Sequence, residues 1–194
     1  QKYDEVFDFK YSVEDNRPSI IQGNAWRTHI NSNYQNWVDI SLQWAGIDWM
    51  QISDEDKRPE ICSFNDKYID WSFDTFGEIS SNVIGIQLQG STLVRSWYKA
   101  SDLPSIIHQK YPDDMVLIFL NGKWSALTKY GQKEIIIPEE YNPLTCSAIM
   151  ISMMDCFISA DSGMSHIAEA ISVPNITIYT TVPSWTRAKY YKFS

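Results

Sequence analysis

The sequence predicts an α/β fold built on a parallel, doubly wound sheet, because strand-like and helix-like segments alternate in its second half. Apolar, β-branched runs at 83–88, 115–120 and 134–137 are separated by polar turns or helix-like segments. The clearest unit is 155–179, in which an apolar run, a polar turn with a glycine, a helix-like stretch and a second β-branched run follow in order. This order is that of a βαβ unit, which places two parallel strands in one sheet.

Two further helices are predicted between these strands. The first begins near Asp102, tolerates Pro104 in its first turn and ends at Lys110, before Pro112. The second covers residues 144–154 and leads into the βαβ unit.

The amino-terminal part of the chain has a less regular pattern of apolar and polar residues than the rest, and we expect the main domain boundary near Ser80. Alternating apolar and acidic residues predict a strand at 3–9, and apolar residues at helical spacing predict a helix at 33–45 that ends at Gly46. Two stretches, 53–59 and 73–82, are expected to be solvated connections. The predicted domains are 1–80 and 81–194.

Composition places the chain among globular proteins and excludes several classes. With 194 residues, 44% hydrophobic and 21% charged, it is long enough to bury a sizeable core. A net charge of -8 argues against the basic surface that nucleic acids or anionic membranes require, so an anionic ligand must be held by local donors. The sequence has no apolar run long enough to span a bilayer and no signal-peptide pattern at its amino terminus.

The cysteines indicate the cellular compartment of the protein, and the first residue indicates how the chain was produced. Cys62, Cys146 and Cys156 form no C-x-x-C motif, so neither a disulfide framework nor a structural zinc site is predicted, and a reducing cytosol fits. Because the chain opens with Gln1, we expect a fragment, a processed product or a shortened chain.

The turn formed by Asp161, Ser162 and Gly163 is the leading candidate for a ligand site. It follows a predicted strand and precedes a helix, whose first N–H groups and positive dipole end attract anions such as phosphates. Gly163 permits close backbone approach or positive φ, and Ser162 offers a hydroxyl and an N–H. The alternative is that Asp161 or Ser162 only caps the helix. His166, one turn on, either donates to a phosphate or ribose or packs in the interior.

A second polar turn, formed by Gly90, Ser91 and Thr92, follows the first predicted strand of the sheet. Arg95 lies close behind this turn and can clamp a phosphate from the opposite side through bidentate, charge-assisted hydrogen bonds. The alternative is an exposed Arg95 that stacks on the neighbouring Trp97.

The run D-S-G-M-S-H-I-A-E-A at 161–170 resembles the donor-site signature of glycosyltransferase family 9, the ADP-heptose:lipopolysaccharide heptosyltransferases. That signature reads approximately D-[ST]-G-x-x-H-[LI]-A-x-A, followed by a proline and a strand, as Pro174 and the run after it do here. Upstream, Gly90 and the R-S-W run at 95–97 are similar to the family's glycine turn and K-x-W element. The resemblance covers most of the chain and is closest over about 83–179.

This resemblance implies a GT-B fold, with a Rossmann-like donor-binding domain at 81–194 and the tail of the acceptor-side domain at 1–80. It implies inverting sugar transfer, without cofactor or bound metal, from a nucleotide-diphosphate donor such as ADP-heptose to a lipopolysaccharide or other lipid-linked glycan. Arg95 would replace the family's phosphate-binding lysine, which keeps the charge but changes the geometry. The residues that the resemblance places at the donor site are Gly90, Ser91, Thr92, Arg95, Asp161, Ser162, Gly163, Met164 and His166.

The chain also departs from the family pattern. It has N-G-K-W at 121–124 where the family has a glycine followed by acidic residues, so no carboxylate matches the contact to donor hydroxyls. After Tyr179, T-T-V-P replaces the family's G-P-T-x-P, and the chain stops at Ser194, before the closing helices. The first part of the amino-terminal domain is missing, so the general base has no match and the catalytic residue is unknown.

Three functions follow from these observations. The first is a partial glycosyltransferase, cytoplasmic or peripheral to the inner face of the membrane, which alone binds nucleotide diphosphates weakly and transfers little sugar. The second is a non-catalytic nucleotide- or carbohydrate-binding module, which the missing base and the eight tryptophans favour. The third is a nucleotide-sugar epimerase, which has less support because no acid and base residues match.

Overall fold

The structure is a computed structural model in which the described residues are 38–39, 42, 45–61, 63–77, 79–90, 96–97, 101–120 and 122–180. The chain divides into two compact units between Ser53 and Asp54. Described residues up to 53 belong to the first unit, and those at 54–180 belong to the second.

The described part of the first unit contains the end of a helix and a short 3-10 helix, η1 (Trp49–Gln51). Leu42 is helical, and the Ile47 N–H donates to its carbonyl oxygen at 2.9 Å. Gly46, between them, has a φ of 74°, which glycine adopts at little cost. The predicted helix end at Gly46 is confirmed, whereas the strand predicted at 3–9 lies outside the described residues.

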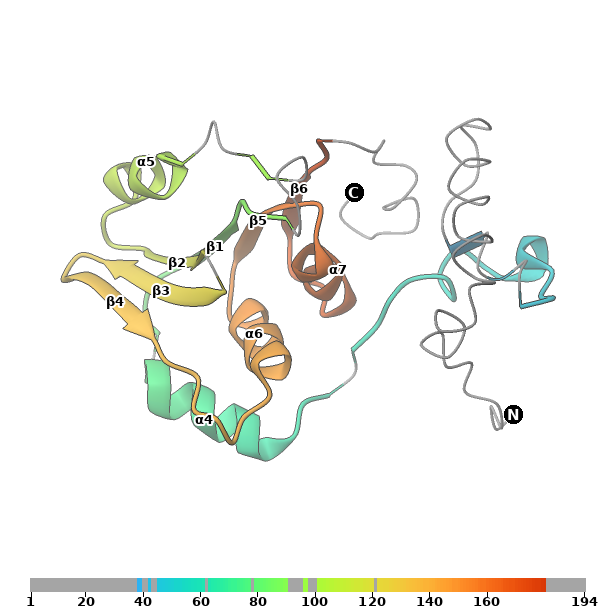
Figure 1. Cartoon of the computed structure of the whole chain (residues 1–194), viewed down its shortest axis with the longest axis horizontal. Helices are drawn as coiled ribbons and strands as arrows, with labels where there is room; N and C mark the ends of the chain where they lie inside the picture. Colours follow the sequence, from blue (N-terminus) through green and yellow to red (C-terminus); the bar gives the residue numbers. More distant parts are fainter. Residues whose placement is uncertain are drawn as a thin grey trace. The chain divides into compact units, whose positions relative to one another are not determined.

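The second unit is built on a six-stranded sheet with the strand order β4-β3-β2-β1-β5-β6 (Figure 1). β1 pairs in parallel with β2 and β5, and β5 pairs in parallel with β6, whereas β3 and β4 are antiparallel. The predicted α/β class with a doubly wound, mostly parallel sheet is confirmed, whereas the antiparallel strands β3 and β4 at one edge were not predicted. The strands are β1 (Val83–Gln87), β2 (Met115–Leu120), β3 (Lys123–Thr128), β4 (Gly131–Ile135), β5 (Cys156–Ala160) and β6 (Asn175–Ile178).

The antiparallel edge of the sheet comes from two tight hairpins. Leu120 pairs with Lys123, which leaves a two-residue connection, and Gly122 in that connection has a φ of 76°. An Asn-Gly pair between two apolar runs is the sequence signal for this turn, because its central residues need positive φ. Lys123 then forms an ion pair with Glu134 on β4 at 2.9 Å. The residues that follow β2, N-G-K-W at 121–124, therefore turn the chain into a hairpin.

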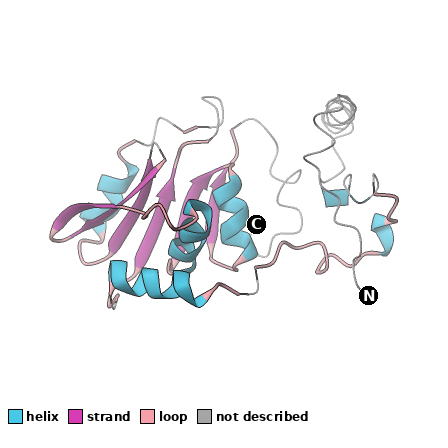
Figure 2. Ribbon diagram, turned by 60° about the horizontal axis from the view of Figure 1, so that its bottom comes forward, coloured by secondary structure: helices cyan, strands magenta, loops and turns pink. Residues whose placement is uncertain are grey.

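Helices cover both faces of the sheet (Figures 1 and 2). α5 (Leu103–Lys110) packs against β2 on one face, and its bounds and its proline in the first turn agree with the prediction. On the other face, α6 (Pro143–Ser152) and α7 (Gly163–Ala170) contact each other, and α4 (Asp66–Phe76) packs against α6.

The structure divides the chain before α4, at an earlier position than the predicted boundary near Ser80. Its charged residues face solvent, whereas Trp71 is 5% exposed and lies in the core, and the Lys67 ammonium donates to the Glu140 carbonyl oxygen at 3.0 Å. The helix continues to Phe76, so the solvated connection predicted at 73–82 is wrong for its first residues. Residues 54–80 were predicted to belong to the amino-terminal domain, because their charged residues make the apolar face of α4 hard to recognise in the sequence.

The pairing of β1 with β5 is fixed at the amino ends of both strands and by close packing along β1. One Asp155 carboxylate oxygen accepts from the Val83 N–H, and the Asp155 N–H donates to the Val83 carbonyl oxygen, both at 2.8 Å. Further along β1, a Cβ atom on Gly85 would lie 2.1 Å from the sulfur of Met154 and 2.7 Å from Cδ2 of Phe157. Only a residue without a side chain therefore fits between the strand and the core.

The two described cysteines are free thiols. Cys146 on α6 is fully buried, and this burial raises the pKa of its thiol to about 11, although the positive charge of Lys67 acts in the opposite direction. Burial, together with the neighbouring Asp155 carboxylate, also raises the pKa of the half-buried Cys156. Both side chains are thus protonated near neutral pH, and a protonated thiol is a poor nucleophile and metal ligand.

We expect Gly85→Ala to lower the free energy of unfolding by about 1–3 kcal/mol, because the added methyl group overpacks the core. Urea unfolding of the variant and the wild type measures this difference. Gly163→Ala is the matched control, because a Cβ atom at Gly163 would meet no atom within 4 Å. Equal stability of Gly85→Ala and the wild type would contradict the packing described for β1.

The raised pKa of Cys146 also predicts how stability depends on pH. Unfolding returns this pKa to 9.0, so above that pH the unfolded chain loses the thiol proton while the folded chain keeps it until about pH 11. The contribution is therefore fully present below pH 9.0 and is lost as the pH rises toward about 11. Urea unfolding at both ends of this range should show a smaller decline for Cys146→Ala than for the wild type, and identical declines would refute the assignment.

Candidate functional site

The carboxyl ends of β1 and β5 form the switch point of the sheet. From β1 the chain passes through α5 to β2 on one side, and from β5 it passes through α7 to β6 on the other. Ligands of open α/β sheets bind outside the carboxyl ends of the strands at such a point. The predicted Asp161 turn follows β5 and therefore lies at this position.

Ser162 caps the amino end of α7. Its hydroxyl oxygen accepts from the Met164 N–H at 3.3 Å, and its backbone is extended. The Ser165 hydroxyl donates to the Ser162 carbonyl oxygen at 2.7 Å and accepts from the Ser162 N–H at 3.4 Å, which completes a capping box. The cap that was one interpretation of this turn is thus present. It satisfies the N–H groups of Ser162, Met164 and Ser165 but not that of Gly163, the first helical residue, which has no partner within the helix.

The Gln87 side chain joins the ends of β1 and β5. The Ser162 hydroxyl donates to Oε1 of Gln87 at 2.9 Å, and Nε2 of Gln87 donates to the carbonyl oxygen of Gln89. Gln87 is 4% exposed and was not among the predicted site residues. A single amide side chain at the end of an otherwise apolar strand is the sequence signal that would have identified it.

A row of polar residues continues from Gln87 across the sheet. Gln87 is aligned with Ser159 on β5, and Ser159 is aligned with Thr177 on β6. Ser159 is fully buried and Asp161 is 4% exposed, yet the Ser159 hydroxyl and one Asp161 carboxylate oxygen have no hydrogen-bond partner among the described residues. Buried polar atoms without partners are rare and costly, so such a pair marks a place where a ligand or water completes the bonding.

Gly163 is exposed, and its role in the free protein is not conformational. Its φ is not positive, so the suggestion that it supplies positive φ is wrong. A Cβ atom there would meet nothing within 4 Å, so the fold itself does not require glycine. The close approach of a ligand to its backbone, the other role predicted for Gly163, stays a prediction.

The turn after β1 folds back on itself beside Gln87. The Trp97 N–H donates to the Leu88 carbonyl oxygen at 2.9 Å, and the Gly90 N–H donates to the Ser96 hydroxyl at 3.1 Å. Gly90 therefore lies at the predicted place, at the carboxyl edge of the sheet. The other residues predicted for this turn lie outside the described residues and stay predictions: Ser91, Thr92 and Arg95.

Two more predicted residues lie on α7. His166 is half-buried, four positions after Ser162, in the second turn of the helix. The Met164 side chain packs against the hydrophobic core, and its N–H is the one that Ser162 caps. A role of Met164 at the site therefore depends on its backbone.

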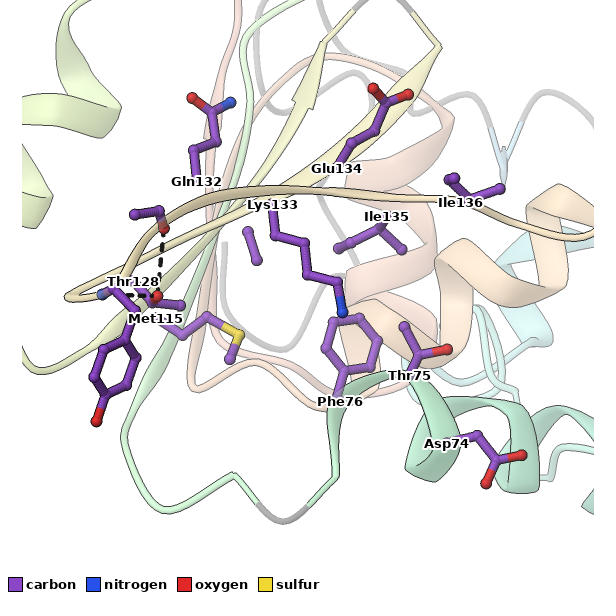
Figure 3. Close-up of a pocket in the computed structure, with 13 residues that line it drawn as sticks. Asp74, Thr75, Phe76, Met115, Thr128, Gln132, Lys133, Glu134, Ile135 and Ile136 are labelled. Carbon is purple, nitrogen blue, oxygen red and sulfur yellow. Dashed lines mark hydrogen bonds between the residues drawn. The ribbon is translucent and has the colours of Figure 1, made fainter.

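Two cavities lie at opposite ends of the sheet. A cavity of about 180 Å³ adjoins the candidate site and is lined by residues that include Leu88, Gln89 and Trp97. A larger one, of about 520 Å³, lies between the end of α4 and the β3–β4 hairpin, where Lys133 points toward Phe76 (Figure 3). None of the predicted site residues that the structure describes lines the larger cavity, which is near the start of β2.

Among the described residues there is no group of three or more His, Cys, Asp or Glu side chains that could hold a metal ion. In the same part of the chain, no helix has the length and apolar character needed to cross a membrane.

Comparisons with known proteins match part of this site to a family model. The arrangement is that of a Rossmann-like turn between a strand and a helix, at the switch point of an α/β sheet. Residues 143–190 match the family model of glycosyltransferase family 9 (heptosyltransferase), a segment that includes β5, α7 and β6. This match confirms the family resemblance over that part of the chain. A search of curated protein sequences gave no significant match.

Two solved structures are similar at a lower level. The iron-containing dodecameric glycosyltransferase TibC from enterotoxigenic E. coli has 18% identity over 60% of this chain and 32% of its own, with a TM-score of 0.43. The iron-containing heptosyltransferase TibC in complex with ADP-D-beta-D-heptose has the same identity and TM-score over 60% of this chain and 31% of its own. The chain thus spans about a third of either structure, and neither serves as a guide to its activity.

We expect Ser162→Ala to lower the free energy of unfolding by about 0.5–2 kcal/mol, because it removes the helix cap and leaves Gln87 without its hydroxyl partner. Thermal and urea unfolding measure the loss. Ser152→Ala, which changes an exposed serine at the end of α6, is the control and should cost less. A Ser162→Ala protein as stable as the control would show that the cap does not hold α7.

Proposed function

We propose that this chain is the donor-binding part of a glycosyltransferase that uses a nucleotide-diphosphate sugar. One coincidence carries the proposal: the segment that matches the family model, 143–190, contains the one capped helix that begins at the switch point, among the described residues. The family-type signature and the ligand position expected of the fold both fall at Ser162 and Gly163.

The chemistry of sugar transfer explains why a turn at the start of a helix would bind the donor. A nucleoside diphosphate leaves with growing negative charge, which backbone N–H groups and the positive end of a helix stabilise. In our proposal the Gly163 N–H and the first turn of α7 supply this field, and the exposed glycine lets an oxygen approach the backbone closely. Arg95 supplies a cation from the other turn. Local donors of this kind are needed because the chain as a whole carries a charge of -8.

The finer features of the reaction extend this proposal. By family resemblance we propose ADP-heptose as the donor, a lipopolysaccharide or other lipid-linked glycan as the acceptor, and inversion without a bound metal in the chemical step. None of the residues at the site is proposed as the general base, which we assign to the acceptor side of the enzyme.

A non-catalytic nucleotide-binding module is a second candidate. The hairpin at Gly122 favours it, because the chain turns there where the family has acidic residues for the donor hydroxyls. Such a module would bind the nucleotide diphosphate and show little preference for a nucleotide with its sugar attached. Measuring both ligands distinguishes the two candidates.

The test is calorimetric titration of the whole chain with ADP, an ADP-sugar, UDP and GDP. We expect at least one of them to bind at millimolar concentration or below, and Gly163→Val to weaken that binding about tenfold or more, because the side chain blocks the backbone N–H. Arg95→Ala should also weaken it, and an unchanged affinity would remove Arg95 from the site.

Tyr130→Ala is the matched control, because Tyr130 is 90% exposed and lines the larger cavity at the other end of the sheet. Its affinity should equal that of the wild type. Failure of all four nucleotides to bind would refute the proposed function, and loss of binding in Tyr130→Ala alone would move the site to the larger cavity.

A further inference from the structure

We propose that Gln87 is a positioning residue that holds the diphosphate-binding end of α7 in its working geometry, acting through Ser162. The inference rests on the proposed function and adds to it a residue that the family signature does not contain. Gln87 closes β1, lies 75 positions before Ser162 in the sequence, and touches it through a hydrogen bond of 2.9 Å.

The two ends of the Gln87 amide have different partners, and this fixes its orientation. Nε2 donates to the Gln89 carbonyl oxygen, so Oε1 is the end that faces Ser162. A carbonyl oxygen only accepts hydrogen bonds, so the Ser162 hydroxyl must be the donor. Gln87 thereby decides where the single hydroxyl proton of Ser162 points.

The direction of the Ser162 hydroxyl proton determines which hydrogen-bond donors at the start of α7 are left for an anion. With its proton directed at Gln87, the Ser162 oxygen turns its lone pairs toward the first turn of α7, where it accepts from the Met164 N–H at 3.3 Å. The hydroxyl therefore does not donate to a phosphate, and the Gly163 N–H, which has no partner within the helix, remains as the donor. Without Gln87, the Ser162 side chain would be free to rotate and to leave the Met164 N–H uncapped.

The same amide connects the two turns of the proposed clamp. Its Nε2 holds the Gln89 carbonyl group in the turn after β1, and its Oε1 holds the cap of α7. Gln87 is 4% exposed and both hydrogen bonds are partly buried, so an amide left without these partners would be costly. The distance between the turns, which must match a diphosphate, is thus set in part by one side chain.

The sheet itself does not need this contact. The backbone ladder aligns β1 with β5 from Ile84 to Gln87, and Asp155 fixes the other end of the pairing. Loss of the Gln87 amide should therefore disturb the two turns while the strands stay paired.

The experiment compares ADP binding with thermal stability for the whole chain and two variants, with UDP and GDP titrated in parallel. Gln87→Leu removes both hydrogen bonds. Ser147→Ala is the control, because it removes a buried hydrogen bond of 3.0 Å to the Trp124 indole in the core, away from the candidate site. We expect both variants to melt earlier than the wild type, and only Gln87→Leu to weaken nucleotide binding, by about tenfold.

A third variant, Gln87→Glu, gives a pH profile that a merely structural role would not produce. An ionised glutamate has no proton to donate to Gln89 and repels a diphosphate, whereas a protonated one reproduces the donor and acceptor of glutamine. Burial next to a bound anion raises the pKa of such a carboxyl group above its usual value of about 4.3. We therefore expect its affinity for ADP, relative to the wild type, to recover as the pH falls from about 7 toward about 5.

The outcomes separate this inference from the proposed function. If the wild type binds a nucleoside diphosphate and Gln87→Leu binds it equally well, the positioning role is overturned and the proposed function stands. A Gln87→Glu deficit that does not change with pH also overturns the role. If the wild type binds neither these three nucleotides nor the ADP-sugar, the proposed function fails and the inference fails with it.

Discussion

The pairing of β1 with β5 is the constraint on which the rest of the structure depends. Asp155 anchors it at one end, and Gly85 lets Met154 and Phe157 lie directly against β1. At the other end, the pairing brings Gln87 to within hydrogen-bond distance of Ser162, although the two are 75 positions apart in the sequence. A slip of one position along the ladder would turn Gln87 to the α5 face of the sheet, and the cap of α7 would lose its contact with β1.

The features predicted correctly from the sequence depend on short stretches of chain. β2 is a run of six apolar residues and α5 has a proline in its first turn, so each carries its own signal. The cap at Ser162 follows from a serine three positions before another serine at the start of an apolar helix. These features can be recognised in a single sequence because each depends on residues that are close together in the chain.

The features that were missed depend on contacts between distant parts of the chain. α4 carries many charges, and only its packing on α6 shows that Trp71 belongs to the core. The β2–β3 hairpin is an exception, because its Asn-Gly pair is a local turn signal that was not predicted as a hairpin. Gln87 is a site residue only because Ser162 lies beside it. The partners of Arg95 in the clamp stay a prediction because Arg95 lies outside the described residues.

The central claim is that a diphosphate binds at the backbone of Gly163, between the turns that follow β1 and β5. The most direct measurement is NMR of the ¹⁵N-labelled chain during titration with ADP. The account predicts that the largest amide shifts occur at Gly90, Gly163 and Met164, with saturation at the same concentration. Shifts confined to the hairpin around Tyr130, or no shifts at millimolar ADP, would contradict it.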